Sequence, residues 1–196
     1  MNFWQLGVPS TVVVDDFLPL RETKDGYKAF FAKAAKDGSM WPLFLEKGFA
    51  KLHGNYAHLE MGSPSQAVSA MTGAPAIIYK HDDDYETPTE LWDDLVKHRK
   101  AGDIMTSASG PGKDTDTDDW GVVLGHAFTI LDLITLSNNV RLLKLRNPWG
   151  SEVYHGKWSD QDDKNWTPEL MKEAKLVKDV NDGIFHIAVE DYHKRF

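Results

Sequence analysis

The chain has 196 residues, 41% of them hydrophobic, and 30 Asp and Glu against 22 Lys and Arg give a formal net charge of −8. This content, with seven Trp, is enough for a packed core in one domain or two small ones, which excludes a disordered chain. The acidity argues against a nucleic-acid partner, because phosphate binding needs a basic face, and the absence of Cys excludes disulfides and thiolate metal sites.

Signals for secretion and membrane insertion are missing from the sequence pattern. The N-terminal residues lack a basic region followed by a long apolar run, so no signal peptide is expected. No apolar stretch reaches the roughly 18 residues that a membrane span needs. The sequence therefore predicts a soluble intracellular protein, with the cytoplasm as the expected compartment and no membrane span.

The first part of the chain is predicted to open with a strand. Residues 11–14 are a β-branched run that ends at two aspartates, which predicts a strand followed by a loop. Residues 25–36 remain open at this point, because the Ala-rich segment FFAKAA favours a helix by propensity alone.

Two helices are predicted next. The first lies between a candidate N-cap, Ser39, and a stop signal, Gly54, and has apolar residues at helical spacing. These apolar residues are Trp41, Phe44, Leu45, Phe49 and Leu52. A shorter helix starts at Ser63-Pro64, where proline suits the first turn, and ends before Gly73.

Residues 79–87 carry several charges and no periodicity, so the boundary between two lobes is placed here, with residues 1–80 in the first lobe and 81–196 in the second. A third helix is predicted from Thr87-Pro88 to Ala101, because acidic residues near its start and basic residues near its end complement the helix dipole. Residues 107–119 are rich in Ser, Gly, Pro, Thr and Asp, which predicts a surface loop.

A buried antiparallel hairpin is predicted in the second lobe. Residues 121–136 and 140–145 are dense in apolar and β-branched side chains, and the polar residues 137–139 separate them. Beyond the hairpin, residues 167–178 are predicted to form a helix, and residues 184–189 a strand that closes the sheet. The whole pattern indicates an α+β fold with a helical N-terminal lobe and an antiparallel C-terminal sheet.

Counting across the hairpin places two polar residues side by side. A four-residue turn at 135–138 pairs His126 with Asn147, because paired positions in an antiparallel ladder have a constant sum. A two-residue turn at 138–139 moves the partner of His126 to Ser151 but still leaves His126 and Asn147 on one face. Only a turn with an odd number of residues separates the two.

An imidazole held by a side-chain amide is two thirds of a thiol-protease triad, in which Asn orients the ring and His takes the proton from Cys. Each residue also has a simpler interpretation. A histidine at the start of a core strand is usually structural, and Asn before Pro commonly starts a turn by bonding its own backbone. Spacing alone therefore leaves the role of His126 and Asn147 open.

The chain resembles the calpain family of cysteine endopeptidases over nearly its whole length. In the second half the segments GHAFTI, LLKLRNPWG and GKWSD are similar to the family's second catalytic subdomain. In the first half FWQLGVPSTVVVDDFLPL and MWPLFLEKGFAKLHGNYAHL resemble the end of the first subdomain. The resemblance is weakest between about residues 79 and 120. It implies a partial papain-like fold, and it implies a strand within the region 25–36 that propensity left open.

The resemblance also implies catalytic roles. His126 and Asn147 fall on the family's catalytic His and Asn, and Trp149 falls on a Trp that shields this pair from water. The family places a loop that gates substrate entry just before the catalytic His, so residues 107–119 are either such a gate or an ordinary solvated loop. The family's nucleophile is a Cys upstream of the FWQ segment, and neither this Cys nor the Gln that precedes it has a counterpart among these residues.

Calcium regulates the family, so the resemblance implies calcium ligands as well. In the second half Asp160 and Asp182 match ligand positions, and in the first half Glu46 matches one. Two other positions are filled by Val153 and Ile184, which have no oxygen in their side chains, and Glu152 is a candidate replacement for one of them. Calcium needs six to eight oxygen ligands, so calcium is a possible cofactor but weak binding is expected.

The acidic residues before the hairpin imitate the start of a second type of calcium site. Asp114, Asp116 and Asp118 have the spacing of the first ligands of an EF-hand loop. The sixth position is Asp119 where the turn needs Gly, and the twelfth is Gly125 where Glu is needed. An EF-hand is therefore rejected.

Two functions follow from these residues. The chain is either the His- and Asn-bearing portion of a calpain-like cysteine endopeptidase, acting on protein or peptide substrates once a Cys-bearing segment is supplied, or a calpain-like pseudoprotease that serves as an interaction module with protein partners. In both cases the chain alone should not cleave peptides. Apolar surface is expected to stay exposed near Trp41, Phe44 and the His126 end of the hairpin, so stable folding is expected to need a partner.

Overall fold

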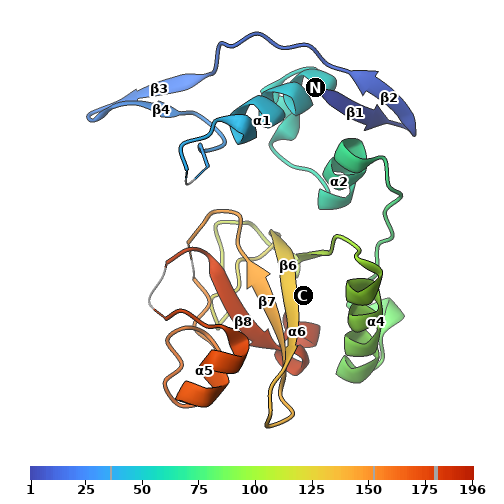
Figure 1. Cartoon of the computed structure of the whole chain (residues 1–196), viewed down its shortest axis with the longest axis vertical. Coiled ribbons are helices and arrows are strands. Elements are labelled where there is room, and N and C mark those ends of the chain that lie inside the picture. The colour runs from blue at the N-terminus through green and yellow to red at the C-terminus, as the bar shows by residue number, and fades with distance from the viewer. Residues whose placement is uncertain (36, 152, 179–180) are drawn as a thin grey trace. The chain divides into compact units, whose positions relative to one another are not determined.

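A computed structural model describes residues 1–35, 37–151, 153–178 and 181–196. The chain divides into two compact units, Met1–Ile78 and Tyr79–Phe196. Figure 1 shows helices together with antiparallel strands, so the predicted α+β class is confirmed. Across the described ranges no helix is both long and apolar enough to cross a membrane.

The first unit begins with a hairpin of β1 (Asn2–Gln5) and β2 (Val8–Thr11). Leu6 and Gly7 form its turn, and both have positive φ, 50° and 79°. A two-residue turn with this backbone matches the twist of paired strands. The strand predicted at residues 11–14 is therefore wrong in position, because the Leu-Gly turn sets the pairing three residues earlier.

A second hairpin follows, made of β3 (Leu20–Thr23) and β4 (Gly26–Ala29). It places a strand at residues 26–29 of the region 25–36, and no helix forms among the described residues of that region. The Ala-rich segment thus does not follow its helix propensity, which tertiary context commonly overrides.

The two predicted helices of the first unit are present. They are α1 (Trp41–Leu52) and α2 (Pro64–Thr72), with a 3-10 turn, η1 (Tyr56–Leu59), between them. The predicted cap of α1 is wrong, because Met40 takes that position and makes no side-chain cap bond. At the end of α2, Gly73 adopts a left-handed φ of 75°, as its sequence position predicted.

The apolar face predicted for α1 differs from the face that is buried. Leu43, Gly48 and Ala50 are buried, whereas the side chain of Trp41 is 61% exposed. The N-terminal hairpin explains the difference, because Phe3 from β1 lies so close to Gly48 that an added Cβ would come within 3.1 Å of its ring. The smallest residue of the helix therefore marks its contact face.

The second unit starts with two helices before its sheet. A short helix, α3 (His81–Asp84), lies in the predicted boundary segment. It is followed by α4 (Pro88–Ala101), which Thr87 and Glu90 cap reciprocally and Gly102 ends in a left-handed conformation. This third predicted helix is confirmed.

The sheet of the second unit has four antiparallel strands in the order β5-β6-β7-β8. The central pair is the predicted hairpin, β6 (Ala127–Thr135) and β7 (Arg141–Arg146), with β8 (Ile184–Ala188) on one side. The other edge is β5 (Thr106–Ala108), which takes two residues from the loop predicted at 107–119.

Two helices complete this unit. The helix α5 (Pro168–Ala174) is capped by Thr167, but it ends before the predicted residue 178 because Lys175 turns left-handed with a φ of 51°. The last helix, α6 (Val189–Arg195), directly follows β8 and was not predicted. The strand β8 is confirmed and stops one residue before the predicted end.

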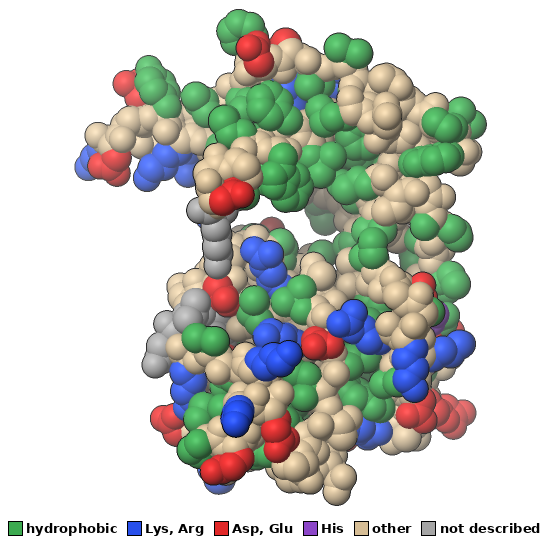
Figure 2. Space-filling model, viewed as in Figure 1, with side chains coloured by type: hydrophobic (Ala, Val, Ile, Leu, Met, Phe, Trp, Pro, Cys, Tyr) green, Lys and Arg blue, Asp and Glu red, His purple; other side chains and the backbone are tan. Residues whose placement is uncertain are grey.

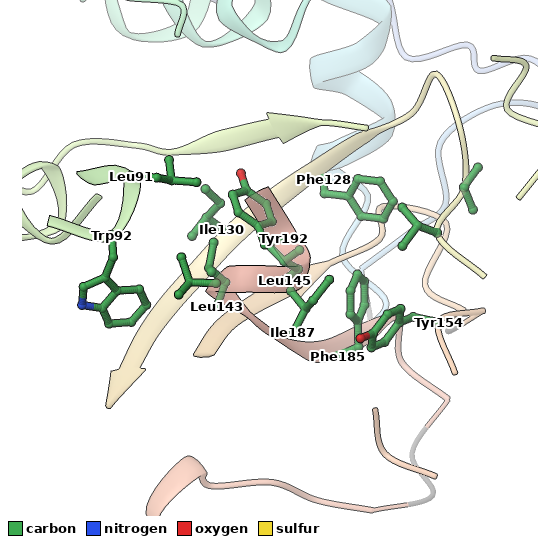
Figure 3. Packing of buried hydrophobic residues seen from close by; sticks show 13 residues of the cluster. Leu91, Trp92, Phe128, Ile130, Leu143, Leu145, Tyr154, Phe185, Ile187 and Tyr192 are labelled. Atoms are coloured by element: carbon green, nitrogen blue, oxygen red, sulfur yellow. The ribbon is translucent and has the colours of Figure 1, made fainter. Parts of the chain in front are cut away.

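The sheet lies between two apolar cores. Leu143, Leu145 and Ile187 face a core that includes Trp92 of α4 and Tyr192 of α6 (Figure 3). The opposite face, with Leu142, packs on α5 and on two tryptophans, Trp158 and Trp166. Figure 1 shows α4 and α5 on opposite sides of the strands. The central strands are therefore fixed from both sides, which gives the residues at their ends a rigid base.

The register of the hairpin differs from the prediction. Thr135 pairs with Arg141, which leaves the five residues 136–140 as the turn. An odd turn would put His126 and Asn147 on opposite faces, but the register shifts by one residue between Ile130 and Asp132. This β-bulge inserts an extra residue into β6. The extra residue of the bulge compensates for the odd number of residues in the turn, so His126 and Asn147 lie on the same face of the sheet.

Candidate active site

His126 immediately precedes β6, and its backbone is held by Ser109. The backbone N–H of His126 donates to Oγ of Ser109 at 3.0 Å, and the carbonyl of His126 accepts from the backbone N–H of Ser109 at 3.0 Å. Ser109 Oγ also donates to the carbonyl of Val123 at 2.6 Å. Sequence reasoning missed Ser109, because serine in a polar loop carries no signal of such a contact.

Asn147 directly follows β7 and is buried, with 2% of its surface exposed. Its backbone N–H donates to the carbonyl of Gly183 at 2.8 Å, which ties it to the segment before β8. Its side-chain Oδ1 lies 3.0 Å from Nε2 of His126. The prediction that these two side chains meet is confirmed, although the predicted register is wrong.

The hydrogen bonds of Asn147 define the tautomer of His126. Oδ1 of Asn147 accepts from the backbone N–H of Trp149 at 3.0 Å, and a backbone N–H can only donate. The atom facing Nε2 is therefore an oxygen, and Nε2 must carry the proton that it donates. In the neutral imidazole this leaves Nδ1 as a proton acceptor. Within the described ranges, no residue forms a hydrogen bond with Nδ1.

The bond from Trp149 to Asn147 also bears on the simpler interpretation of Asn147. An Asn side chain that accepts from the backbone two residues later is an Asx turn, which Asn before Pro commonly forms. Here the turn and the contact with His126 use the same oxygen. The turn therefore orients the amide for the imidazole, and the two interpretations hold together.

Aromatic rings surround the imidazole of His126. The ring of Trp149 lies 4.5 Å from it, centroid to centroid, at an angle of 52°. The ring of Phe128 meets it edge-on at 5.0 Å. Apolar neighbours reduce water access and strengthen the bond to Asn147. The side chain of Trp149 is 44% exposed, so it covers one side of the imidazole while facing solvent with the other.

Among the described residues, those proposed as calcium ligands belong to no group that could hold a metal ion. Glu46 lies in the first unit and accepts from the backbone N–H of Ala32 at 3.0 Å. In the second unit, Asp160 is buried and Asp182 accepts from the N–H of Ile184 at 2.9 Å. Among the described residues, no three His, Cys, Asp or Glu are grouped so that they could hold a metal ion. Glu152 lies outside the described residues.

The acidic loop before the hairpin is used for internal contacts. Oδ1 of Asp118 accepts from the backbone N–H groups of Trp120 and Val122, each at 2.8 Å. Its other oxygen bonds to Arg195. Asp118 is therefore a structural carboxylate, both of whose oxygens accept hydrogen bonds from within the chain.

A histidine held by an asparagine at the end of an antiparallel sheet is the arrangement of a cysteine-protease catalytic subdomain. The calpain family of cysteine proteases matches the chain over residues 1–196, and the chain belongs to this family.

Individual relatives match to a similar degree. The chain is 34% identical to mouse calpain-12 over 200 residues and 32% identical to the rat calpain-1 catalytic subunit over 202 residues, with all of this chain covered in both cases. It is 31% identical to the rice calpain-type cysteine protease ADL1 over 194 residues, which cover 94% of this chain. The chain spans 26% and 27% of the length of the two animal calpains and 9% of the rice protein.

Proposed function

We propose that this chain supplies the general base and its orienting amide to a calpain-type cysteine endopeptidase. The proposal rests on one observation, the 3.0 Å bond from Nε2 of His126 to Oδ1 of Asn147, which leaves Nδ1 as the acceptor. The 196 residues contain no Cys. The nucleophilic thiol therefore has to come from a segment outside this sequence.

The proposed reaction follows from that tautomer. Nδ1 of His126 takes the proton of the thiol, and the thiolate attacks the scissile carbonyl carbon. The imidazolium then gives this proton to the leaving amine. A water molecule, deprotonated by the same nitrogen, releases the acyl group from sulfur. Asn147 holds the ring throughout by accepting from Nε2, and Trp149 shields this bond from water.

We also propose that the two units correspond to parts of two catalytic subdomains. Residues 1–80 would be the end of the first subdomain and residues 81–196 the second, which carries His126 and Asn147. The substrates would be proteins or peptides, as in other cysteine endopeptidases. Calcium binding is not proposed, because the described residues include no group of three His, Cys, Asp or Glu that could hold a metal ion.

An interaction module is the second candidate function. Large apolar side chains are exposed on the first unit, and Figure 2 shows hydrophobic side chains over much of its visible face. They include Leu6, Val8, Val13, Phe17, Tyr27 and Trp41. Apolar patches of this kind commonly mark surfaces that bind proteins. A pseudoprotease that retains the fold but not the nucleophile would use this surface for its partner.

One experiment separates the two functions. The chain is expressed with any sequence that is encoded upstream of Met1. Hydrolysis of a fluorogenic peptide is then measured beside labelling by an irreversible thiol-directed inhibitor. The enzyme proposal expects labelling and turnover, with loss of turnover in His126→Ala and retained turnover in His155→Ala, a matched change at an exposed histidine. Absence of both labelling and turnover in the unmodified protein would favour the interaction module.

A further inference from the structure

The last residues of α6 meet the loop that leads to His126. The guanidinium of Arg195 donates to the carboxylate of Asp118 and to that of Asp119, the latter at 2.6 Å. The same guanidinium lies 4.0 Å from the ring centroid of Trp120. Three consecutive loop residues therefore contact one side chain from the end of the chain.

The contact is sheltered from solvent. The side chains of Arg195 and Asp118 are 17% and 19% exposed, so their attraction is screened less than that of a surface pair. Partial burial acts to lower the pKa of Arg195, but hydrogen bonds to Asp119 and Asp118 outweigh it and leave this pKa raised. The guanidinium therefore stays charged, and it stacks on an aromatic face, a geometry that lysine does not reproduce.

Asp118 links Arg195 to the backbone of the loop. One carboxylate oxygen accepts from Arg195, while the other accepts from the N–H groups of Trp120 and Val122. The backbone N–H of Asp118 in turn donates to the carbonyl of Val122 at 2.9 Å. The position of Arg195 thus fixes the path of residues 118–122.

Two routes connect this part of the loop to His126. Val123 follows directly, and its carbonyl accepts from Oγ of Ser109, the atom that also accepts from the N–H of His126. On the second route, the N–H of Gly110 donates to the carbonyl of Arg195 at 3.4 Å, and the N–H of Gly125 donates to the carbonyl of Gly110 at 2.8 Å. The first route ends at the N–H of His126, and the second ends at Gly125, the residue directly before it.

We propose that Arg195 is a positioning residue for His126. Its hydrogen bonds to Asp118 and Asp119 hold residues 109–125 in one conformation. Through Ser109, this conformation keeps the imidazole of His126 within hydrogen-bond distance of Asn147. The catalytic part of this inference rests on the proposed function, whereas the structural part does not. The loop is therefore bound to α6, and any movement of the loop away from α6 has to break the contact between Arg195 and the two aspartates first.

Amide hydrogen exchange tests whether Arg195 holds the loop. It is measured on the 196-residue chain in the oligomeric state in which the chain is purified. In Arg195→Gln, amides of residues 109–126 should exchange about tenfold faster, whereas those of β7 should change less than about twofold. Arg195→Lys should be intermediate. The matched control is Arg141→Gln, which removes a guanidinium paired with Glu190 on the same helix at 3.1 Å and placed near Trp92, away from the loop.

A double-mutant cycle tests the route through Asp118. Asp118→Asn keeps an oxygen for the two backbone N–H groups but removes the negative charge that pairs with Arg195. The double variant with Arg195→Gln should therefore show amide exchange in the loop no faster than that of the faster single variant. Additive effects would overturn the route. Unchanged loop exchange in Arg195→Gln, equal acceleration in Arg141→Gln, or equal acceleration throughout β7 would overturn the positioning role.

Kinetics of the thiol-bearing protein test the catalytic part. Arg195→Gln should lower kcat about tenfold with KM within about twofold, and Arg195→Lys should recover part of the loss. A raised KM with unchanged kcat would overturn the positioning role. If the unmodified protein shows no turnover at all, the proposed function fails while the exchange result still decides whether Arg195 holds the loop.

Discussion

Gly183 lies directly against the backbone of Asn147. Its carbonyl accepts the N–H of Asn147 at 2.8 Å, and a Cβ atom at Gly183 would come within 2.7 Å of the carbonyl oxygen of Asn147. Gly183 also has a φ of 80°, which an L-residue adopts at an energetic cost. The placement of the proposed orienting amide thus depends on a residue without a side chain.

Gly183→Ala should therefore displace Asn147 and weaken its bond to His126. The matched control is Gly102→Ala, which has nearly the same φ, 82°, but nothing within 4 Å of the added Cβ. Thermal unfolding should show about 1 kcal/mol of destabilisation in the control from strain alone and more in Gly183→Ala. Equal destabilisation would show that the contact with Asn147 has no effect.

The 196-residue chain alone should have no peptidase activity. A neutral His126 held by Asn147 can accept a proton, but without Cys the chain holds no thiol for it to activate. Fluorogenic calpain substrates incubated with the purified chain provide the measurement. Hydrolysis that disappears in His126→Ala would contradict the prediction, whereas hydrolysis that persists in this variant indicates a contaminant.

His186 should make the stability of the second unit depend on pH. The side chain is 1% exposed, and neither ring nitrogen has a hydrogen-bond partner among the described residues. Burial, with a smaller contribution from the charge of Lys144, lowers its pKa from an ordinary value of 6.5 to about 4. The folded state therefore binds this proton less readily than the unfolded state does.

The sign of the effect follows from this order. Above about pH 6.5 the free energy of unfolding has its full value with respect to this group. As the pH falls from about 6.5 to about 4, the free energy of unfolding decreases by a total on the order of 3 kcal/mol. Chemical unfolding at several pH values measures it. His186→Phe should flatten the profile in this window, while His58→Phe, at an exposed histidine of the first unit, should leave it unchanged. A profile that is the same in all three proteins would exclude His186 as the cause.

Calcium should have little effect on the stability of the chain. A bound ligand raises the unfolding temperature in proportion to the logarithm of its concentration over Kd. Since the described residues include no group of three His, Cys, Asp or Glu that could hold a metal ion, the thermal unfolding curves in calcium and in chelator should coincide. A rise in unfolding temperature that Asp160→Asn and Asp182→Asn abolish would restore these residues as ligands.

The purified chain should associate rather than remain a monomer. The apolar side chains exposed on the first unit, among them Phe17, Tyr27 and Trp41, provide the driving force. Sedimentation at micromolar concentration should show oligomers or a complex with a co-purifying protein. A well-folded monomer would contradict this prediction, and replacing Phe17 and Tyr27 with Ser should shift the distribution towards monomer if association uses this surface.

Local signals in the sequence predicted the elements that depend on local chemistry. Acidic residues near the start and basic residues near the end marked α4, and the apolar runs on either side of residues 137–139 marked β6 and β7. The Leu6-Gly7 turn was missed because leucine rarely adopts positive φ. The region 25–36 was left open because the helix propensity of its Ala-rich segment and the resemblance to the family favour different structures.

The support of the proposed site could not be predicted, because it depends on contacts distant in the sequence. Arg195 is separated from Asp118 by 77 positions, and only folding brings them together. The predicted proximity of His126 and Asn147 was correct although the turn length was not. The bulge near Leu131 arises where one strand packs between two cores, and nothing in the local pattern indicates it.

The bulge and the five-residue turn make the hairpin sensitive to changes in length. Removing one residue from the turn alone would rotate every position of β6 before it to the other face, and His126 would point away from Asn147. Removing the bulged residue alone would have the same result. Removing one residue from each would bring the pair together again, so single deletions in this hairpin should be harmful individually and compensate each other when combined.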